Sequence, residues 1–353
     1  MKASYKRILL QFKRPSGTSR GVMTEKESWL LKIEENGKIG IGECGVLRSL
    51  SFDDRPTYEE QLQWVVKNIS KGKDWLWENL QDWPSIQFGV EQAFLSLEAN
   101  NPLELFPSAF TKGEDKIAIN GLVWMGEPAF MKEQIDEKLA TGFSCVKLKI
   151  GAIDFDKELE LLQYIRAHYS AKEIELRVDA NGGFGLSDAF DKLVKLSELE
   201  LHSIEQPIKK GYTDSMAELC KTTPLPIALD EELIGVVDLN HKKNLLDEIR
   251  PQYIILKPSL VGGIRGSMEW ISLAEERGIG WWITSALEGN IGLNAIAQWT
   301  YTLQSTLPQG LGTGALYTNN IDSPLEVKKG ALYYNANKPW DEEMIEQLFR
   351  ENV

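Results

Sequence analysis

Three carboxylates recur at nearly equal spacing in the middle of the chain, each at the end of a short apolar run. Asp179, Glu205 and Asp230 are 26 and 25 positions apart. If these runs are parallel strands of one sheet, the side chains converge, and their charges repel one another unless a cation neutralises them. No cysteine or histidine takes part, so the set favours Mg²⁺, for which Mn²⁺ can substitute, over zinc. The alternative is that each acid is an unconnected helix cap or turn former.

Lysines end two further runs. Lys147 and Lys149 are two positions apart and therefore lie on the same side of a strand, and Lys257 ends a later run. Lys147 and Lys149 disfavour each other's charge, and a nearby metal ion adds to this effect. We therefore expect the ammonium pKa to fall from about 10.4 towards the working pH, as a general base requires. Taken alone, Lys257 is equally compatible with a surface lysine that covers apolar neighbours.

The elements that must position these groups begin near Lys116, where β-rich runs alternate with amphipathic stretches. Eight such runs are present, at 117–124, 145–150, 174–180, 202–207, 226–231, 253–259, 281–287 and 310–314. Strands about 25 residues apart with helices between them pair in parallel, and eight such units close into a (β/α)₈ barrel. Helices are expected behind Asp154 and behind Ser187. Catalytic groups of such barrels lie at the carboxyl ends of the strands, where the five charged groups stand.

The second and sixth strands lie opposite each other in an eight-membered ring, so Lys149 and Lys257 face each other across the carboxylates. A substrate carboxylate bound to the metal would expose opposite faces of its α-carbon to the two amines. The cation would stabilise the enediolate that forms when the α-proton is removed.

The first hundred residues predict a separate α+β unit. Three antiparallel strands are expected at 5–12, 29–33 and 38–44, and a helix is expected behind Pro84. The tail contains a strand near 331–334 and a helix from Asp341. We therefore predict a capping domain over 1–115, with 320–353 packing back on it, and a barrel over 116–319.

The composition argues against two kinds of partner. The formal net charge is −13 and no basic run is present, so a nucleic-acid backbone would be repelled. No segment approaches the length of a membrane span, and the apolar run 8–10 is too short for a signal peptide. The three cysteines lack metal or disulfide spacing, which fits a reducing cytoplasm. We expect a cytoplasmic protein that binds a small-molecule carboxylate; the sequence does not define its oligomeric state.

The ordered motifs resemble those of the enolase superfamily, in particular the muconate-lactonizing-enzyme subgroup. They are KLK at 147–149, DAN at 179–181, EQP at 205–207, DE at 230–231 and LKP at 256–258. GIGEC at 40–44 is similar to the family's glycine-acidic turn in the capping domain. The resemblance implies a capped barrel that uses Mg²⁺ held by Asp179, Glu205 and Asp230.

Three further motifs are similar to the subgroup members that dehydrate 2-succinyl-6-hydroxy-2,4-cyclohexadiene-1-carboxylate to 2-succinylbenzoate in menaquinone biosynthesis. They are NGLVW at 120–124, RVD at 177–179 and SALE at 285–288. This resemblance implies that Lys149 is the base and then the acid, and that Lys257 is a cation over the enediolate's opposite face. The expected catalytic set also includes Lys147, and the expected substrate contacts are Asn181, Arg177, Ser259, Thr284, Ser285 and Glu288. Two capping-loop residues, Arg20 and Arg48, are candidate anion contacts, or else ordinary solvated arginines.

Other activities compete with dehydration. Two opposed lysines also suit an amino-acid or dipeptide epimerase, but the last predicted strand lacks the carboxylates with which the family's dipeptide epimerases hold an ammonium group. N-succinylamino acid racemase activity escapes this objection because the amine is masked. A sugar-acid dehydratase would use a histidine on a late strand, and a non-catalytic metal-binding protein would be expected to lose one of the charged positions. We therefore expect a lyase.

Overall fold

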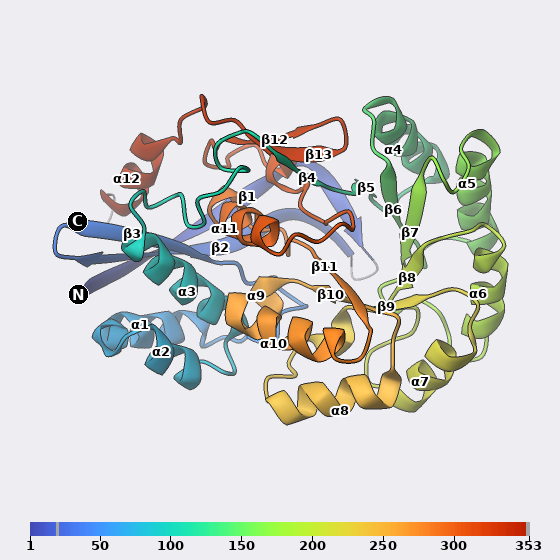
Figure 1. The fold of residues 1–353 in the computed structure, drawn as a ribbon, viewed down its shortest axis with the longest axis horizontal. Helices are drawn as coiled ribbons and strands as arrows, with labels where there is room; N and C mark the ends of the chain where they lie inside the picture. The colour runs from blue at the N-terminus through green and yellow to red at the C-terminus, as the bar shows by residue number, and fades with distance from the viewer. Residues whose placement is uncertain (19–20, 351–353) are drawn as a thin grey trace.

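The computed structural model describes residues 1–18 and 21–350. Figure 1 shows an antiparallel sheet with three helices on one side of the molecule and a curved parallel sheet ringed by helices on the other. Within the described residues, no helix is long and apolar enough to cross a membrane.

The N-terminal unit contains the three expected antiparallel strands; the first two are longer than expected and the third has the expected bounds. They are β1 (Lys2–Thr18), β2 (Gly21–Glu35) and β3 (Lys38–Cys44), joined in that order. Its helices are α1 (Tyr58–Asn68), η1 (Ile69–Lys71), α2 (Lys73–Asn79) and α3 (Pro84–Glu98). One face of the sheet packs Trp29, Leu31 and Ile33 against these helices. Gly42 is required where α3 crosses β3, because a Cβ there would lie 1.9 Å from the Gly89 carbonyl oxygen.

The second sheet is parallel and has seven strands in the order β11-β10-β9-β8-β7-β6-β5. The strands are β5 (Gly121–Val123), β6 (Cys145–Lys149), β7 (Glu175–Asp179), β8 (Ser203–Glu205), β9 (Ile227–Leu229), β10 (Tyr253–Leu256) and β11 (Gly280–Ile283). The helices are α4 (Pro128–Ala140), α5 (Phe155–His168), α6 (Ala189–Ser197), α7 (Thr213–Thr222), α8 (Leu239–Ile249), α9 (Pro258–Val261), α10 (Gly263–Glu275) and α11 (Asn290–Thr302). This alternation confirms the barrel-like α/β fold.

The ring closes differently from the expectation. No strand forms over 310–314; instead Gln309 bridges to Ile119 and Gly310 bridges to Thr284, both in parallel. Glycines at 310, 312 and 314 explain the short pairing, since glycine weakens a strand. The first run is also divided, because β4 (Lys116–Ala118) pairs with the tail and only β5 joins the parallel sheet.

The tail contacts both units. Strand β13 (Ala331–Tyr334) pairs antiparallel with β12 (Leu325–Lys328) and with β4. Helix α12 (Glu342–Arg350) packs Ile345 against Leu30 and Ile41 of the capping sheet. We propose from this arrangement that 1–115 with 320–353 forms the capping domain and 116–319 the barrel.

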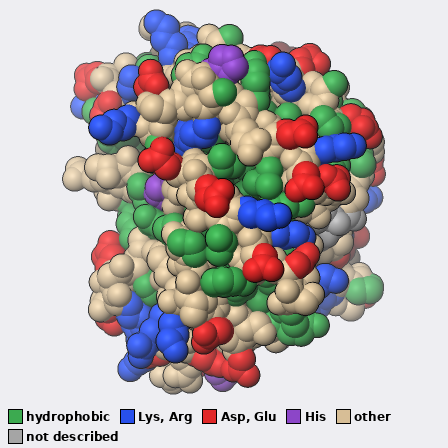
Figure 2. Space-filling model, turned by 90° about the vertical axis from the view of Figure 1, so that its right-hand side faces the viewer, with side chains coloured by type: hydrophobic (Ala, Val, Ile, Leu, Met, Phe, Trp, Pro, Cys, Tyr) green, Lys and Arg blue, Asp and Glu red, His purple; other side chains and the backbone are tan. Residues whose placement is uncertain are grey.

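Two expected helices differ in how well their details were predicted. Asp154 caps α5 as expected, accepting from the amides of Asp156 and Lys157 at 3.1 and 3.3 Å. In α6, however, Asp188 and not Ser187 precedes the first helical residue; Leu193 is buried, whereas Phe190 and Val194 are 43% and 36% exposed. Figure 2 looks at the side of the molecule formed by α4 to α7, where acidic and basic side chains are mixed.

Candidate active site

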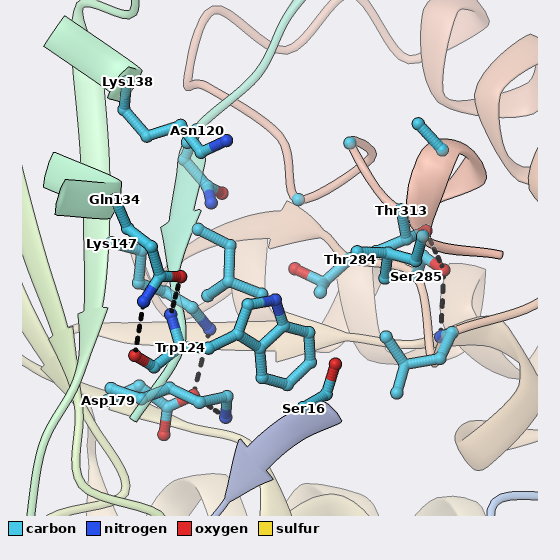
Figure 3. A pocket seen from close by; sticks show the side chains of 18 of the residues that line it. Ser16, Asn120, Trp124, Gln134, Lys138, Lys147, Asp179, Thr284, Ser285 and Thr313 are labelled. Carbon is cyan, nitrogen blue, oxygen red and sulfur yellow. Dashed lines mark hydrogen bonds and ion pairs between the residues drawn. The ribbon is translucent and has the colours of Figure 1, made fainter. Parts of the chain in front are cut away.

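A cavity of about 490 Å³ opens at the carboxyl ends of the parallel strands. Lys147 and Lys149 from β6, Asp179 from β7, and Lys257 after β10 line it. The β1–β2 hairpin, through Ser16 and its neighbours, and the loop around Leu47 cover it. In Figure 3 the Trp124 indole lies between Lys147 and Asp179 on one side and Ser285 and Thr313 on the other. The capping unit and the barrel therefore enclose one cavity.

Lysines and carboxylates alternate along the floor. Lys147 Nζ donates to Asp179 Oδ2 at 3.1 Å and also contacts Glu205. Lys257 Nζ contacts Asp230 and lies 3.6 Å from Glu205 Oε1. The three carboxylates are 1–2% exposed, and Glu205 and Asp230 lie beneath the cavity lining. The strand ends thus bring together the charged residues that the spacing predicted.

The pKa values reflect this crowding. Burial, with the Asp179 charge, raises the pKa of Glu205 to about 7. Burial alone would raise the pKa of Asp179, but the neighbouring lysines outweigh it and lower that pKa. Burial alone would lower the pKa of Lys147, but Asp179 and Glu205 outweigh it, so the pKa is raised. The expected fall is therefore wrong for Lys147, because two carboxylates contact its ammonium group.

The carboxylates have the chemistry of a magnesium site but not its finished geometry. In the part of the chain that the structure describes, no three acidic, histidine or cysteine side chains are gathered closely enough to hold a metal ion. The ammonium groups of Lys147 and Lys257 lie between them instead. Glu205 Oε1 is buried without a hydrogen-bond donor, and all three ligand candidates present oxygen, the donor that Mg²⁺ prefers. The donor set therefore fits Mg²⁺ once the lysines turn aside.

Lys149 has a different environment. Its Nζ donates to Asp179 Oδ2 at 2.9 Å and to Asn181 Oδ1 at 2.8 Å. Asn181 has the left-handed φ of 45° and donates its amide to Glu231 Oε1 at 3.0 Å. Asn181 therefore orients the Lys149 amine and lines the cavity, as expected of a contact residue.

The expected substrate contacts after β10 and β11 fall into two groups. Thr284 and Ser285 line the cavity, whereas Ser259 and Glu288 lie behind its wall. Ser259 and Ser285 both donate to the Glu288 carboxylate at 2.5 Å. Ser259 and Glu288 are therefore corrected from substrate contacts to buried neighbours of the wall.

Of the three arginines predicted to contact substrate, the two that the structure describes, Arg177 and Arg48, do not line the cavity. Arg177 lies two residues before Asp179 on the same face of β7, so it points into the amino-terminal end of the barrel, where it donates to the Pro308 carbonyl and stacks 4.2 Å from the Trp282 ring. Arg48 is held by Glu27 and Asp54. Arg20 lies outside the described residues.

Sequence reasoning missed the uncharged wall. Trp124, Leu47, Leu50, Asn120 and Thr313 line the cavity, but in sequence they look like ordinary core or loop residues. Trp124 stood in a motif similar to the family, which was the one signal available for it. Asn120 stands in the same motif. Leu47 and Leu50 depend on how the capping unit sits on the barrel, and spacing along the chain does not contain that information.

Comparisons with known proteins agree on the family. A family model described as enolase C-terminal domain-like matches residues 130–339. The chain is 48% identical to o-succinylbenzoate synthase from Desulfotalea psychrophila over 94% of this chain and 98% of that protein. The crystal structure of MenC from the same organism has a TM-score of 0.83, covering 94% and 99% of the two chains at 44% identity.

A dipeptide epimerase from Cytophaga hutchinsonii, whose structure holds Mg and the dipeptide D-Ala-L-Val, shares the fold with a TM-score of 0.80. It is 20% identical and covers 94% of this chain and 92% of its own. The epimerase is thus much more distant in sequence than the Desulfotalea relative.

Proposed function

The chain belongs to the o-succinylbenzoate synthases of the enolase superfamily, and we propose that it uses Lys149 and Lys257 to dehydrate 2-succinyl-6-hydroxy-2,4-cyclohexadiene-1-carboxylate to 2-succinylbenzoate. The observation that carries the residue assignment is that β6 and β10 bring both lysines into one cavity, on either side of the carboxylates of β7 to β9. A base on one face and a cation on the other suit proton removal next to a carboxylate.

Asp179, Glu205 and Asp230 would hold Mg²⁺, with Mn²⁺ as a substitute. The buried oxygen set supports this assignment, as does Glu205 Oε1, which has an ion-pair partner in Lys257 at 3.6 Å but no hydrogen-bond donor. When bound, the cation supplies positive charge that stabilises the negative charge developing on the substrate carboxylate. Lys147 would then lose its contacts with Asp179 and Glu205 and would act only as a positive charge near the site.

Lys149 would do the acid–base work. As the free amine it takes the proton from the α-carbon, and the C–H electron pair moves into the carboxylate to give an enediolate. The carboxylate re-forms as the ring C–O bond breaks, and the Lys149 ammonium returns the proton to the departing hydroxide, which leaves as water. The ring becomes aromatic, and all atoms and electrons are accounted for.

Lys257 would remain protonated throughout. Burial alone would lower its pKa, but Asp230 and Glu205 outweigh this and raise it. A permanent cation over the opposite face stabilises the enediolate without exchanging a proton. Trp124 and Leu47 would cover the ring of the substrate.

The test is turnover by the purified chain. With Mg²⁺ the cyclohexadiene acid should be converted to 2-succinylbenzoate, and a chelator should stop the reaction. A parallel incubation of each enantiomer of N-succinylamino acids in deuterated water measures α-deuterium incorporation. Racemisation without any turnover of the cyclohexadiene acid would replace dehydration by racemase activity and keep the same lysines and metal site.

We also propose that the chain works in the cytoplasm on a small-molecule carboxylate. Its three cysteines are buried and free, which suits a reducing compartment. The net charge of −13 remains an argument against a nucleic-acid partner.

A further inference from the structure

Three buried charges that the proposed chemistry does not use lie where the capping sheet meets the barrel. Lys26 of β2, Glu43 of β3 and Glu288 after β11 are 3%, 0% and 0% exposed, and we name them the interface cluster. Burying one cation with two carboxylates is costly unless each group has partners, so the arrangement calls for a reason.

Glu43 attaches the capping sheet to the barrel. Its Oε1 accepts from the Gly289 amide at 2.7 Å and its Oε2 from the Gly292 amide at 2.8 Å. These amides begin α11, so a carboxylate from another part of the chain caps this helix and complements its dipole. The loop between β11 and α11, residues 284–289, is thereby fixed relative to the capping sheet.

Glu288 determines in which direction two hydroxyl groups donate their hydrogen bonds, and these hydroxyl groups form a chain that reaches the cavity. Ser285 donates to Glu288 Oε2 at 2.5 Å, and Thr313 donates to Ser285 Oγ at 2.8 Å. Ser285 and Thr313 both line the cavity. Because each hydroxyl has one hydrogen and both are donated towards Glu288, Thr313 presents only lone pairs to the cavity.

The charge of Lys26 favours the carboxylate form of Glu288, which accepts from two serines, and so opposes burial, which raises the pKa of Glu288. The buried Lys26 ammonium group donates to the Glu27 carbonyl at 3.3 Å, and the charges of Glu43 and Glu288 act on it without a direct contact. Gly45 lies between it and Glu288. A Cβ at Gly45 would be 3.7 Å from Lys26 Nζ and 3.0 Å from Glu288 Cγ. Without the lysine, Glu43 and Glu288 would lie near each other with hydrogen-bond donors but no buried cation, and we expect Glu288 to take up a proton and donate to a serine. Ser285 would then donate to Thr313, and the Thr313 hydroxyl would point its hydrogen into the cavity.

We propose that Lys26 and Glu288 are positioning residues that hold the Thr313 hydroxyl as a hydrogen-bond acceptor for a hydroxyl or N–H group of the bound substrate. The capping sheet in this way sets the polarity of a cavity wall that belongs to the barrel. The inference rests on the proposed function for its substrate, but not for the hydroxyl chain itself.

The test compares KM and kcat for Lys26→Met, Glu288→Gln, their double variant and Thr313→Val. Each single variant should raise KM about tenfold and change kcat little, because a contact made equally in ground and transition states acts on KM. The two increases in KM should not multiply in the Lys26→Met/Glu288→Gln double variant, since either change alone reverses the direction in which the hydroxyl groups donate. Lys26→Arg should recover most of the affinity. Lys32→Met, which removes an outward lysine on the same strand paired with Glu34, is the matched control and should behave as wild type.

Wild-type KM in both Glu288→Gln and Thr313→Val, or a double variant whose KM rises by the product of the single effects, would overturn the inference. Thr313→Val removes no charge, so it tests the idea even if the charge variants fold poorly. If the wild type does not turn over the cyclohexadiene acid, the proposed function fails separately. In that case the Tm values of the variants test the coupling of Lys26 with Glu288. The double variant should have a Tm at least as high as that of Lys26→Met, and a lower Tm would refute the coupling.

Discussion

Among single residues, the surroundings of the two proposed catalytic lysines differ. Lys257 contacts Asp230 and lies near Glu205, two carboxylates that keep it protonated. Lys149 donates to one carboxylate, Asp179, which also accepts from Lys147, and its other hydrogen bond goes to the neutral side-chain amide of Asn181. This asymmetry suits one lysine for proton exchange and the other for holding charge.

The first prediction follows from these unequal roles. Lys149→Ala should lower kcat by about 10² to 10⁴, the usual contribution of a general base. Lys257→Arg keeps a cation and should retain more activity than Lys149→Arg, because arginine cannot accept the proton. Steady-state kinetics with the cyclohexadiene acid measures both. Equal losses in the two arginine variants would favour proton exchange on both faces, as in a racemase. If Lys149→Ala were nearly normal and Lys147→Ala inactive, the base would be Lys147 and not Lys149.

The second prediction concerns the carboxylates. Asp179→Asn, Glu205→Gln and Asp230→Asn should each abolish turnover with Mg²⁺, since an amide oxygen is a weaker ligand for a hard cation. The fold should persist in each, as judged by circular dichroism. Calorimetric titration with Mg²⁺ separates a lost metal site from a lost catalytic step. A variant with the wild-type rate would remove that residue from the site.

At the scale of elements, parallel strands were predictable because their apolar runs end in polar residues at a regular spacing. Asp179, Glu205 and Asp230 were found together for this reason. The partition of the first run into β4 and β5 was not predictable, because the partner of β4 is β13, more than two hundred positions away. Ser259 and Glu288 stand at strand ends like true contacts, and only the three-dimensional path of the loops places them behind the wall.

A buried carboxylate between two helices gives the third prediction. Glu91 of α3 accepts from the amides of Ile264 and Arg265 at the start of α10, at 2.5 and 3.1 Å. Burial raises its pKa to about 7, although these amides, Lys73 and Arg265 oppose the rise. From about pH 4.5 to 7 the unfolded chain therefore loses this proton before the folded one, and stability falls as pH increases.

Urea unfolding at pH 5 and pH 7.5 checks this sign. The free energy of unfolding of the wild type should fall relative to that of Glu91→Gln between the two values, by up to roughly 3 kcal/mol. Glu98→Gln, an exposed position on the same helix, is the control and should track the wild type. A constant difference between wild type and Glu91→Gln would show that the carboxyl group titrates near its ordinary pKa.

Across the whole molecule, the tail connects the two units. Strand β13 covers β4 next to the barrel, and α12 covers Leu30 and Ile41 of the capping sheet. Helix α3 is buried along almost its whole length, between β3 and the α9–α10 region. The two proposed domains therefore share their cores and should unfold together.

The fourth prediction tests this sharing by truncation. A chain ending at residue 319 should aggregate or melt well below the wild type, because the edge of β4 and an apolar face of the capping sheet become exposed. A chain ending at residue 340 loses only α12 and should fold with a smaller decrease in Tm. Scanning calorimetry of the wild type should show one transition. Two resolved transitions, or an unchanged Tm after removal of 320–353, would mean that the units are independent.

Among the residues that the structure describes, only two, Gln309 and Gly310, close the ring of parallel strands between β11 and β5. We expect the barrel to open locally at this junction first. Gln309 and Gly310 hold it with backbone hydrogen bonds to residues 118–120 on one side and to Ile283 and Ser285 on the other. In native-state hydrogen exchange, the amides of Asn120, Gly310 and Ser285 should take up deuterium earlier than those within β6 to β8, each of which pairs with a strand on both sides. Because Asn120, Gly310 and Ser285 also line the cavity, each such opening admits solvent from the flank and not from beneath the capping sheet. Uptake that begins in β6 to β8 would instead locate the weakest line of the barrel on the opposite side.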